Sequence, residues 1–261
     1  MRTPDFAGYL EPIARTKSSN IEVFKDFTRM GACALAAWTR EPEYLEIAKR
    51  YNKEELQEIC KAFGSLIGEM ENEPFEDLLG SYYQDAASKS TRDNRWEFFT
   101  PPCISELMAK IGFNAEKVIA DGKPVSVSEP TCWSWSMVLQ IAKQLSPVVT
   151  WKKESHVDLL RATMQDISPV AVDMSYINMT SWWIPAHLIH GNTLSMEIWD
   201  QWKNMHWHRV WEDARLKTKQ ILEFLKDPGS THTQQEVVSI GVDAQEIKTK
   251  ETESGQFEFD L

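Results

Sequence analysis

The sequence predicts an α/β protein in which a helical N-terminal region precedes a domain of alternating strands and helices. Apolar residues recur at three- and four-residue spacing through residues 1–74, which is typical of amphipathic helices. Short β-branched runs then alternate with helical segments through residues 75–226, which favours parallel βαβ units. Residues 227–261 are polar, acidic and without periodicity, so we expect a disordered tail.

The helical elements can be placed from their apolar spacing. Residues 24–40 and 43–72 carry apolar side chains on one face and Glu and Lys on the other, so each predicts helix. A polar stretch then leads to the segment "FFTPPCISELMAKIGF", where Pro101 and Pro102 would open a helix from about Ile104.

The following segments alternate in type. We expect strands in "KPVSVSEP" (123–130), "VDLLRATMQDI" (157–167) and "AHLIHGNTL" (186–194). We expect helices in "SMVLQIAKQL" (136–145) and "VAVDMSYINMT" (170–180). Residues 195–226 are rich in tryptophan and predict one long helix or two shorter ones.

Composition restricts the environment and the partners. No apolar run approaches the roughly 20 residues that span a bilayer, and the N-terminus lacks a signal-peptide core, so we expect a cytoplasmic protein without membrane contact. Of the net charge of −11, −6 comes from residues 227–261. Without a basic stripe, DNA contact would depend on a few local Lys and Arg side chains.

Metal and disulfide chemistry are not indicated. The four cysteines lie far apart without a C-x-x-C pair, so we expect reduced thiols. His206 and His208 are two positions apart, which would separate them on a helix, and His187 and His190 gain no nearby Cys or carboxylate cluster. We therefore predict no metal site.

The turn after the first predicted strand has an unusual composition. In doubly wound α/β proteins this loop carries glycines so that backbone N–H groups can approach a nucleotide. Residues 129–136 read Glu-Pro-Thr-Cys-Trp-Ser-Trp-Ser. This segment resembles the S-adenosylmethionine loop, Asp-Pro-Ala-Cys-Gly-Ser-Gly-Gly, of DNA N6-adenine methyltransferases, specifically the modification subunits of type I restriction systems and their short phage and plasmid relatives.

Three further segments carry the resemblance in the same order. The Phe-Thr-Pro segment at 98–101 is similar to one that lines the methionine end of the cofactor in that family. An acidic residue ends the second predicted strand, where ribose hydroxyls would bind. A Gly-Asn-Thr-Leu segment closes the third predicted strand near the adenine. The resemblance implies a truncated Rossmann-like methyltransferase domain. It assigns these positions to the cofactor: Phe99, Thr100, Pro101, Glu129, Thr131, Trp133, Trp135, Asp166 and Asn192.

Two departures from the family pattern lead us to expect a degenerate enzyme. Trp133 and Trp135 replace glycines, so their indoles would fill the cofactor space; alternatively, either ring could turn toward a partner or stack on adenine. After Leu194 there is no Asn- or Asp-Pro-Pro-aromatic segment to hold a flipped base, and the chain ends before four more strands, so we assign no catalytic residue.

Two functions remain open at this point. The chain acts as a phage or mobile-element pseudoenzyme that binds DNA, a host restriction-modification complex or replication machinery, or it is an active adenine methyltransferase completed by a partner subunit.

Two further groups of residues have a plain and a functional interpretation. We interpret six tryptophans as core packing, with a stacking platform or partner anchor as the alternative: Trp182, Trp183, Trp199, Trp202, Trp207 and Trp211. In the tail, Gln256, Phe257, Phe259 and Leu261 resemble a sliding-clamp hexapeptide, and a plain charged terminus is the alternative.

Overall fold

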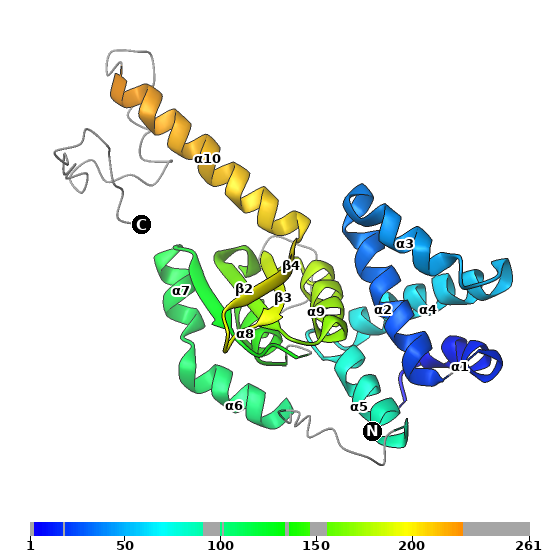
Figure 1. Cartoon of the computed structure of the whole chain (residues 1–261). Helices are drawn as coiled ribbons and strands as arrows, with labels where there is room; N and C mark the ends of the chain where they lie inside the picture. The colour runs from blue at the N-terminus through cyan, green and yellow to red at the C-terminus, as the bar shows by residue number, and fades with distance from the viewer. Residues whose placement is uncertain are drawn as a thin grey trace. The chain divides into compact units, whose positions relative to one another are not determined.

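The computed structural model describes residues 3–17, 19–90, 100, 102–133, 136–146 and 156–226 (Figure 1). The chain divides into two compact units, Met1–Val210 and Trp211–Leu261, and the last helix crosses the boundary between them. The tail hexapeptide lies outside the described residues. The boundary expected near residue 74 stays a prediction.

The N-terminal region is helical. It contains α1 (Ala7–Thr16), α2 (Asn20–Leu35), the 3-10 helix η1 (Ala37–Arg40), α3 (Glu41–Ala48) and α4 (Lys53–Asn72), followed by α5 (Leu78–Ser90). The start of α2 is capped by Ser19, whose side chain accepts the Glu22 N–H. A full capping box between Asn52 and Glu55 begins α4.

The α/β part has the expected alternation. Its elements in chain order are α6 (Pro102–Gly112), α7 (Ala115–Asp121), β1 (Val125–Glu129), α8 (Ser136–Leu145), the 3-10 helix η2 (Val157–Leu159), β2 (Leu160–Asp166), α9 (Pro169–Ser181), β3 (Ala186–Asn192), β4 (Glu197–Lys203) and α10 (Met205–Lys226). The sheet order is β1-β2-β3-β4, with the first three strands parallel. The predicted α/β class is confirmed.

One secondary-structure prediction is wrong. Residues 197–203 form β4, which pairs antiparallel with β3, so the tryptophan-rich helix begins only at Met205. The two strands approach so closely that a β-carbon on Gly191 would lie 2.1 Å from the Glu197 carbonyl oxygen. A register shift between His190 and Gly191 interrupts the alternation of side chains in β4, and Trp199 there packs edge-on against His190 with ring centroids 5.0 Å apart.

Helices cover one face of the sheet. The β1–α8–β2 and β2–α9–β3 crossovers advance in the same direction, so right-handed connections place α8 and α9 on the same side. Leu160, Ala162 and Met164 of β2 are buried, whereas the alternate residues of that strand are polar and only half-buried. Figure 1 shows α9 between the sheet and α2, in agreement with the contacts among these elements.

Ion pairs join the N-terminal helices to the sheet layer. The Arg29 guanidinium donates to buried Asp173 of α9 at 2.9 Å. Arg40 donates to Asp200 of β4 at 2.7 Å, and its guanidinium lies 4.2 Å from the Trp202 ring centroid. The helical region and the sheet of the first unit therefore share one interior.

Candidate functional site

The candidate site lies where β1, β2 and β3 end. Because parallel strands present their carboxyl ends at one edge, the terminal residues Glu129, Asp166 and Asn192 are brought to the same edge of the sheet. The cofactor roles that the resemblance gives to these three residues stay predictions. The loop of residues 130–133 follows β1 at this edge.

Backbone hydrogen bonds fix this loop on β2. The Cys132 N–H donates to the Gln165 carbonyl at 2.9 Å, and the Trp133 N–H donates to Asp166 Oδ2 at 2.8 Å. The Trp133 carbonyl in turn lies 3.0 Å from the Ser175 hydroxyl of α9, whose single proton it shares with the Ala171 carbonyl of the same helix. The loop is therefore held by both backbone polar groups of Trp133, the N–H on β2 and the carbonyl on α9.

Trp133 itself has left-handed backbone geometry, with φ of 44°. This conformation suits the glycine that the family pattern places there and costs a residue with a β-carbon about 1–2 kcal/mol. The half-buried indole packs edge-on against Tyr83 of α5, with ring centroids 5.3 Å apart. The side chain therefore points toward the helical core and packs against it.

The Asp166 carboxylate is hydrogen-bonded to backbone amides of the protein. Its side chain is buried, with Oδ2 accepting the Trp133 N–H and Oδ1 accepting the Ser168 N–H at 2.8 Å. Burial raises the pKa of this carboxyl, although the backbone N–H donors oppose the shift by stabilising the charged form. Both oxygens that the resemblance assigns to ribose hydroxyls thus bind backbone amides.

The Asn192 side chain also binds neighbouring backbone groups. Its side-chain oxygen accepts the Leu194 N–H at 3.0 Å and the Ser195 N–H at 3.4 Å, which closes the turn between β3 and β4. The next residue, Thr193, donates its hydroxyl to the Pro130 carbonyl at 2.5 Å. The hairpin and the loop after β1 are therefore linked directly.

The remaining assigned positions are less informative. Glu129 is half-buried, and burial raises the pKa of its carboxyl. Thr131 and Thr100 are exposed. Phe99, Pro101 and Trp135 lie outside the described residues.

An apolar surface next to the site was missed by sequence reasoning. We call it the hairpin patch; its members and their exposed fractions are Ile167 (60%), Leu194 (97%), Met196 (82%), Ile198 (54%) and Trp199 (50%). The sequence interpretation placed residues 195–199 on a helix, where an apolar stripe would face a core. In the structure they flank a hairpin turn and face outward.

The tryptophan cluster is divided between interior and surface. Trp182 stacks on Phe75 with ring centroids 4.6 Å apart, and Trp202 is 3% exposed, so core packing accounts for both. Trp183, Trp199 and Trp211 are exposed. Among the described residues, no group of three or more His, Cys, Asp or Glu is arranged to hold a metal ion.

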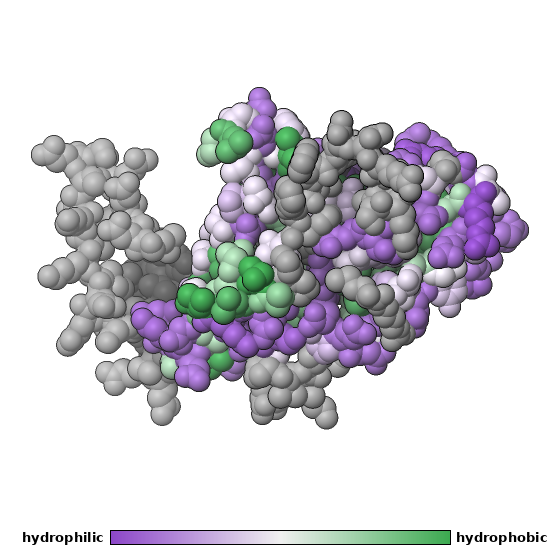
Figure 2. Space-filling model, turned by 90° about the horizontal axis from the view of Figure 1, so that it is seen from below, coloured by the Kyte–Doolittle hydropathy of each residue, from purple (hydrophilic) through white to green (hydrophobic). Residues whose placement is uncertain are grey.

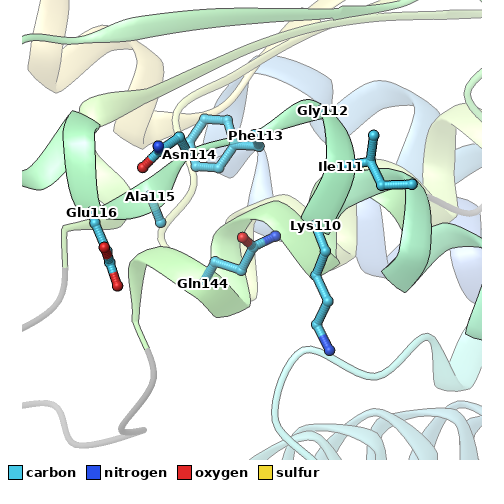
Figure 3. A pocket seen from close by; sticks show the side chains of 8 residues that line it. All are labelled: Lys110, Ile111, Gly112, Phe113, Asn114, Ala115, Glu116 and Gln144. Carbon is cyan, nitrogen blue, oxygen red and sulfur yellow. The ribbon is translucent and has the colours of Figure 1, made fainter.

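A pocket of about 530 Å³ lies away from the candidate site (Figure 3). Its lining comes from residues 110–116 and from Gln144 near the end of α8. Because α8 runs back from the carboxyl edge of the strands, its last turn lies at the opposite edge. None of the described helices combines the length and apolar content that a bilayer crossing requires.

Comparison with known proteins places the chain in a family. A family model described as N-6 DNA Methylase matches residues 73–235, which is more than half of the 261 residues. The chain belongs to the N-6 DNA methylase family. The resemblance drawn from the loop and its three companion segments is thereby confirmed.

Two individual proteins are also similar. The methylase subunit of the type I restriction enzyme MpnII from Mycoplasma pneumoniae (strain ATCC 29342 / M129 / Subtype 1) is 27% identical over 191 residues, which cover 72% of this chain and 31% of that protein. The chain thus spans about a third of that relative. A crystal structure from Listeria monocytogenes, described as a class I S-adenosylmethionine-dependent methyltransferase, is 20% identical with a TM-score of 0.44, covering 76% of this chain and 55% of that one.

Proposed function

We propose that this N-6 DNA methylase family member acts by binding a protein partner and does not transfer methyl groups. The observation that carries the proposal is the bond between the Trp133 N–H and Asp166, which closes the loop after β1 onto the end of β2. Two of the residues that the family resemblance assigns to the cofactor, Trp133 and Asp166, are thus bonded to each other. This closed arrangement supports the proposed loss of S-adenosylmethionine binding.

The geometry at Asp166 supports this proposal. A carboxylate oxygen can accept more than one hydrogen bond, so the backbone donors alone do not exclude a ribose hydroxyl. However, Asp166 as a whole residue is only 8% exposed, and a hydroxyl must reach its carboxylate directly. Seating a ribose there would require the loop to open and would break the bonds from Trp133 to Asp166 and from Ser175 to Trp133.

The surface at this edge favours a protein partner over DNA. Residues 129–133, 165–168 and 190–199 contain no Lys or Arg but include Glu129, Asp166 and Glu197. Phosphate recognition depends on cationic side chains, so this edge offers little to a DNA backbone. Exposed apolar side chains of the hairpin patch are instead typical of protein interaction sites. A subunit of a restriction-modification complex is the partner class we propose.

The alternative is an active S-adenosylmethionine-dependent adenine methyltransferase completed by a partner subunit. Family membership and the position of Asp166 and Asn192 at neighbouring strand ends favour it. This function requires the loop to open on ligand binding and the missing base-binding segment to come from the partner.

Calorimetric titration with S-adenosylmethionine separates the two functions. We expect no binding heat with the wild-type chain, and micromolar binding would contradict the proposal. The matched variant combines Trp133→Gly with Trp135→Gly, which removes both bulky side chains and restores the family glycines. Because glycine keeps the backbone N–H that donates to Asp166, recovery of binding by this variant would identify the indoles rather than that bond as the obstacle.

A further inference from the structure

The second face of the sheet gathers polar side chains. Helices α8 and α9 cover the face formed by the buried residues of β2, and α6 and α7 contact α8. On the other face, Arg161 pairs with Ser126, while Thr163 pairs with His187, which pairs with Lys203. We call this surface the open face; its polar members are exposed or half-buried and are Ser126, Ser128, Arg161, Thr163, Gln165, His187, Gln201 and Lys203.

Three cations on or beside the open face have no carboxylate partner among the residues that the structure describes. They are Arg161, Lys203 and Arg209, the last of which lies near the start of α10. In the helical region, by contrast, Arg29 and Arg40 each bind carboxylates. In a chain with a net charge of −11, a group of unpaired cations stands out.

These cations also lie near other cationic or titratable groups. Burial lowers the pKa of the Arg161 guanidinium; the charge of Asp158 opposes the shift, and that of Arg209 adds to it. Burial likewise lowers the pKa of His187, and the cross-strand charge of Lys203 adds to that shift. Because like charges repel, an anion placed among these groups would be stabilised.

We propose that the open face binds the phosphate backbone of a single nucleic-acid strand. Phosphate and sugar oxygens are contacted by Arg and Lys and by Ser, Thr, Asn and Gln side chains. Apart from His187, every polar member of the open face is of one of these types, and none is Asp or Glu.

The proposed site is separate from the carboxyl edge. Arg161 lies near the start of β2, and Lys203 ends the antiparallel β4, so both lie toward the amino edge of the parallel strands. With strands about 4.8 Å apart, the row from β2 to β4 is about 10 Å long. The proposal therefore does not depend on the partner proposed for the hairpin patch or on the loss of the cofactor.

The composition of the open face favours a single strand over other polyanions. An acidic protein segment would need an apolar core to its interface, but Ile189, which pairs with Gln165 on this face, is only 9% exposed. Figure 2 shows the contrast, because apolar residues gather on the underside, over the region where Figure 1 places α6. Duplex DNA is read by a helix or β-ribbon that enters a groove, whereas a single strand lies along a sheet surface.

The number of cations predicts the salt dependence. If Arg161, Lys203 and Arg209 each neutralise one phosphate, the logarithm of the association constant should fall with that of the salt concentration with a slope of about −2. Affinity should then drop roughly 20-fold between about 50 and 200 mM salt. Lys203→Gln should reduce the size of the slope by about 0.7, and an unchanged slope would contradict a phosphate contact there.

Fluorescence anisotropy of a labelled oligothymidylate of about 20 nucleotides, titrated with the full chain, tests the proposal. We expect Lys203→Glu and Arg209→Glu each to weaken binding about tenfold or more at about 50 mM salt, because a carboxylate then faces phosphate. The matched control is Lys61→Glu, which makes the same charge change on an exposed side chain of α4 and should alter affinity less than about twofold. Thermal melting of each variant checks that the fold is retained. Absence of binding at low salt, or an equal loss with Lys61→Glu, overturns the proposal.

Unlabelled competitors identify the occupant. Oligouridylate has the same phosphate spacing, so it should displace the probe about as well as oligothymidylate, and a preference of more than about tenfold for either would contradict binding through the backbone. Duplex DNA and polyglutamate of matched charge should compete at least about tenfold less well. If either displaces the probe as well as the single strand does, the proposed occupant is wrong.

Discussion

Trp133→Gly should destabilise the protein less than Trp133→Ala, which reverses the usual order of these residues. Both variants remove the half-buried indole and its contact with Tyr83. Only the glycine variant relieves the left-handed backbone, because φ of 44° is costly for any residue with a β-carbon. Elsewhere, glycine costs more than alanine because it leaves the unfolded chain more freedom.

The expected magnitudes follow from burial and geometry. Truncating a fully buried Trp to Ala costs about 3–5 kcal/mol, so a half-buried indole should cost about 2 kcal/mol. Relief of the left-handed strain is worth about 1–2 kcal/mol, and the greater freedom of unfolded glycine offsets part of it. We therefore expect Trp133→Gly to be about 1 kcal/mol more stable than Trp133→Ala.

Urea denaturation of both variants measures this difference. Trp207 supplies a matched control, since it is a half-buried Trp in helical backbone on α10. There, Gly should be worse than Ala by up to about 1 kcal/mol, the value for a helix interior, because Trp207 lies in the first turn of α10. If the two variants at position 133 follow the helical order instead, the loop does not hold the left-handed geometry. The bond from Trp133 to Asp166, and the cofactor argument built on it, would then fail.

Three other properties can be checked with single changes. Burial raises the pKa of Asp173 from 3.8 to about 7, so its stabilising contribution is present below about pH 4 and is lost as the pH rises through 7. Urea titrations of the wild type and of Asp173→Asn give the difference between their unfolding free energies. This difference should fall by a few kcal/mol over this pH window, and a constant difference would refute the raised pKa. Asn204→Ala should lower the free energy of unfolding by about 3 kcal/mol, because the buried Asn204 side chain accepts the N–H groups of Ala186 and Trp207 and donates to the Ile184 carbonyl. Calorimetric melting measures this loss, and an unchanged melting temperature would contradict the role. Deleting residues 256–261 should abolish capture by an immobilised sliding clamp if the tail hexapeptide binds it, whereas equal capture of both chains would dismiss that motif.

The sequence predicted those elements whose periodicity has one interpretation. Strand β2 and helix α8 were placed because the spacing of their apolar residues and their turn signals agree. Strand β4 was missed because Ile198, Trp199 and Trp202 fit a helical spacing as well as a strand. What decides between them is pairing with β3, including the close approach at Gly191, and pairing is a tertiary property.

The site was predictable in position but not in detail. Chain order placed Glu129, Asp166 and Asn192 at strand ends, and parallel pairing then brought those ends together. The partner of Asp166 could not be inferred, because it depends on the backbone of a residue 33 positions away. The orientation of Trp133 depends on Tyr83 and Ser175, which reach the loop from α5 and α9.

The contacts of the loop also explain how a strained tryptophan can be retained. A left-handed non-glycine residue persists only when its surroundings determine its conformation from several sides. Trp133 meets this condition through its N–H on Asp166, its carbonyl on Ser175 and its ring on Tyr83. The loop also supports the hairpin through the bond from Thr193 to Pro130. A preorganised surface loses less entropy on association. A closed loop that supports the hairpin patch therefore favours the proposed binding of a partner, whereas catalysis at the same edge would need an open loop.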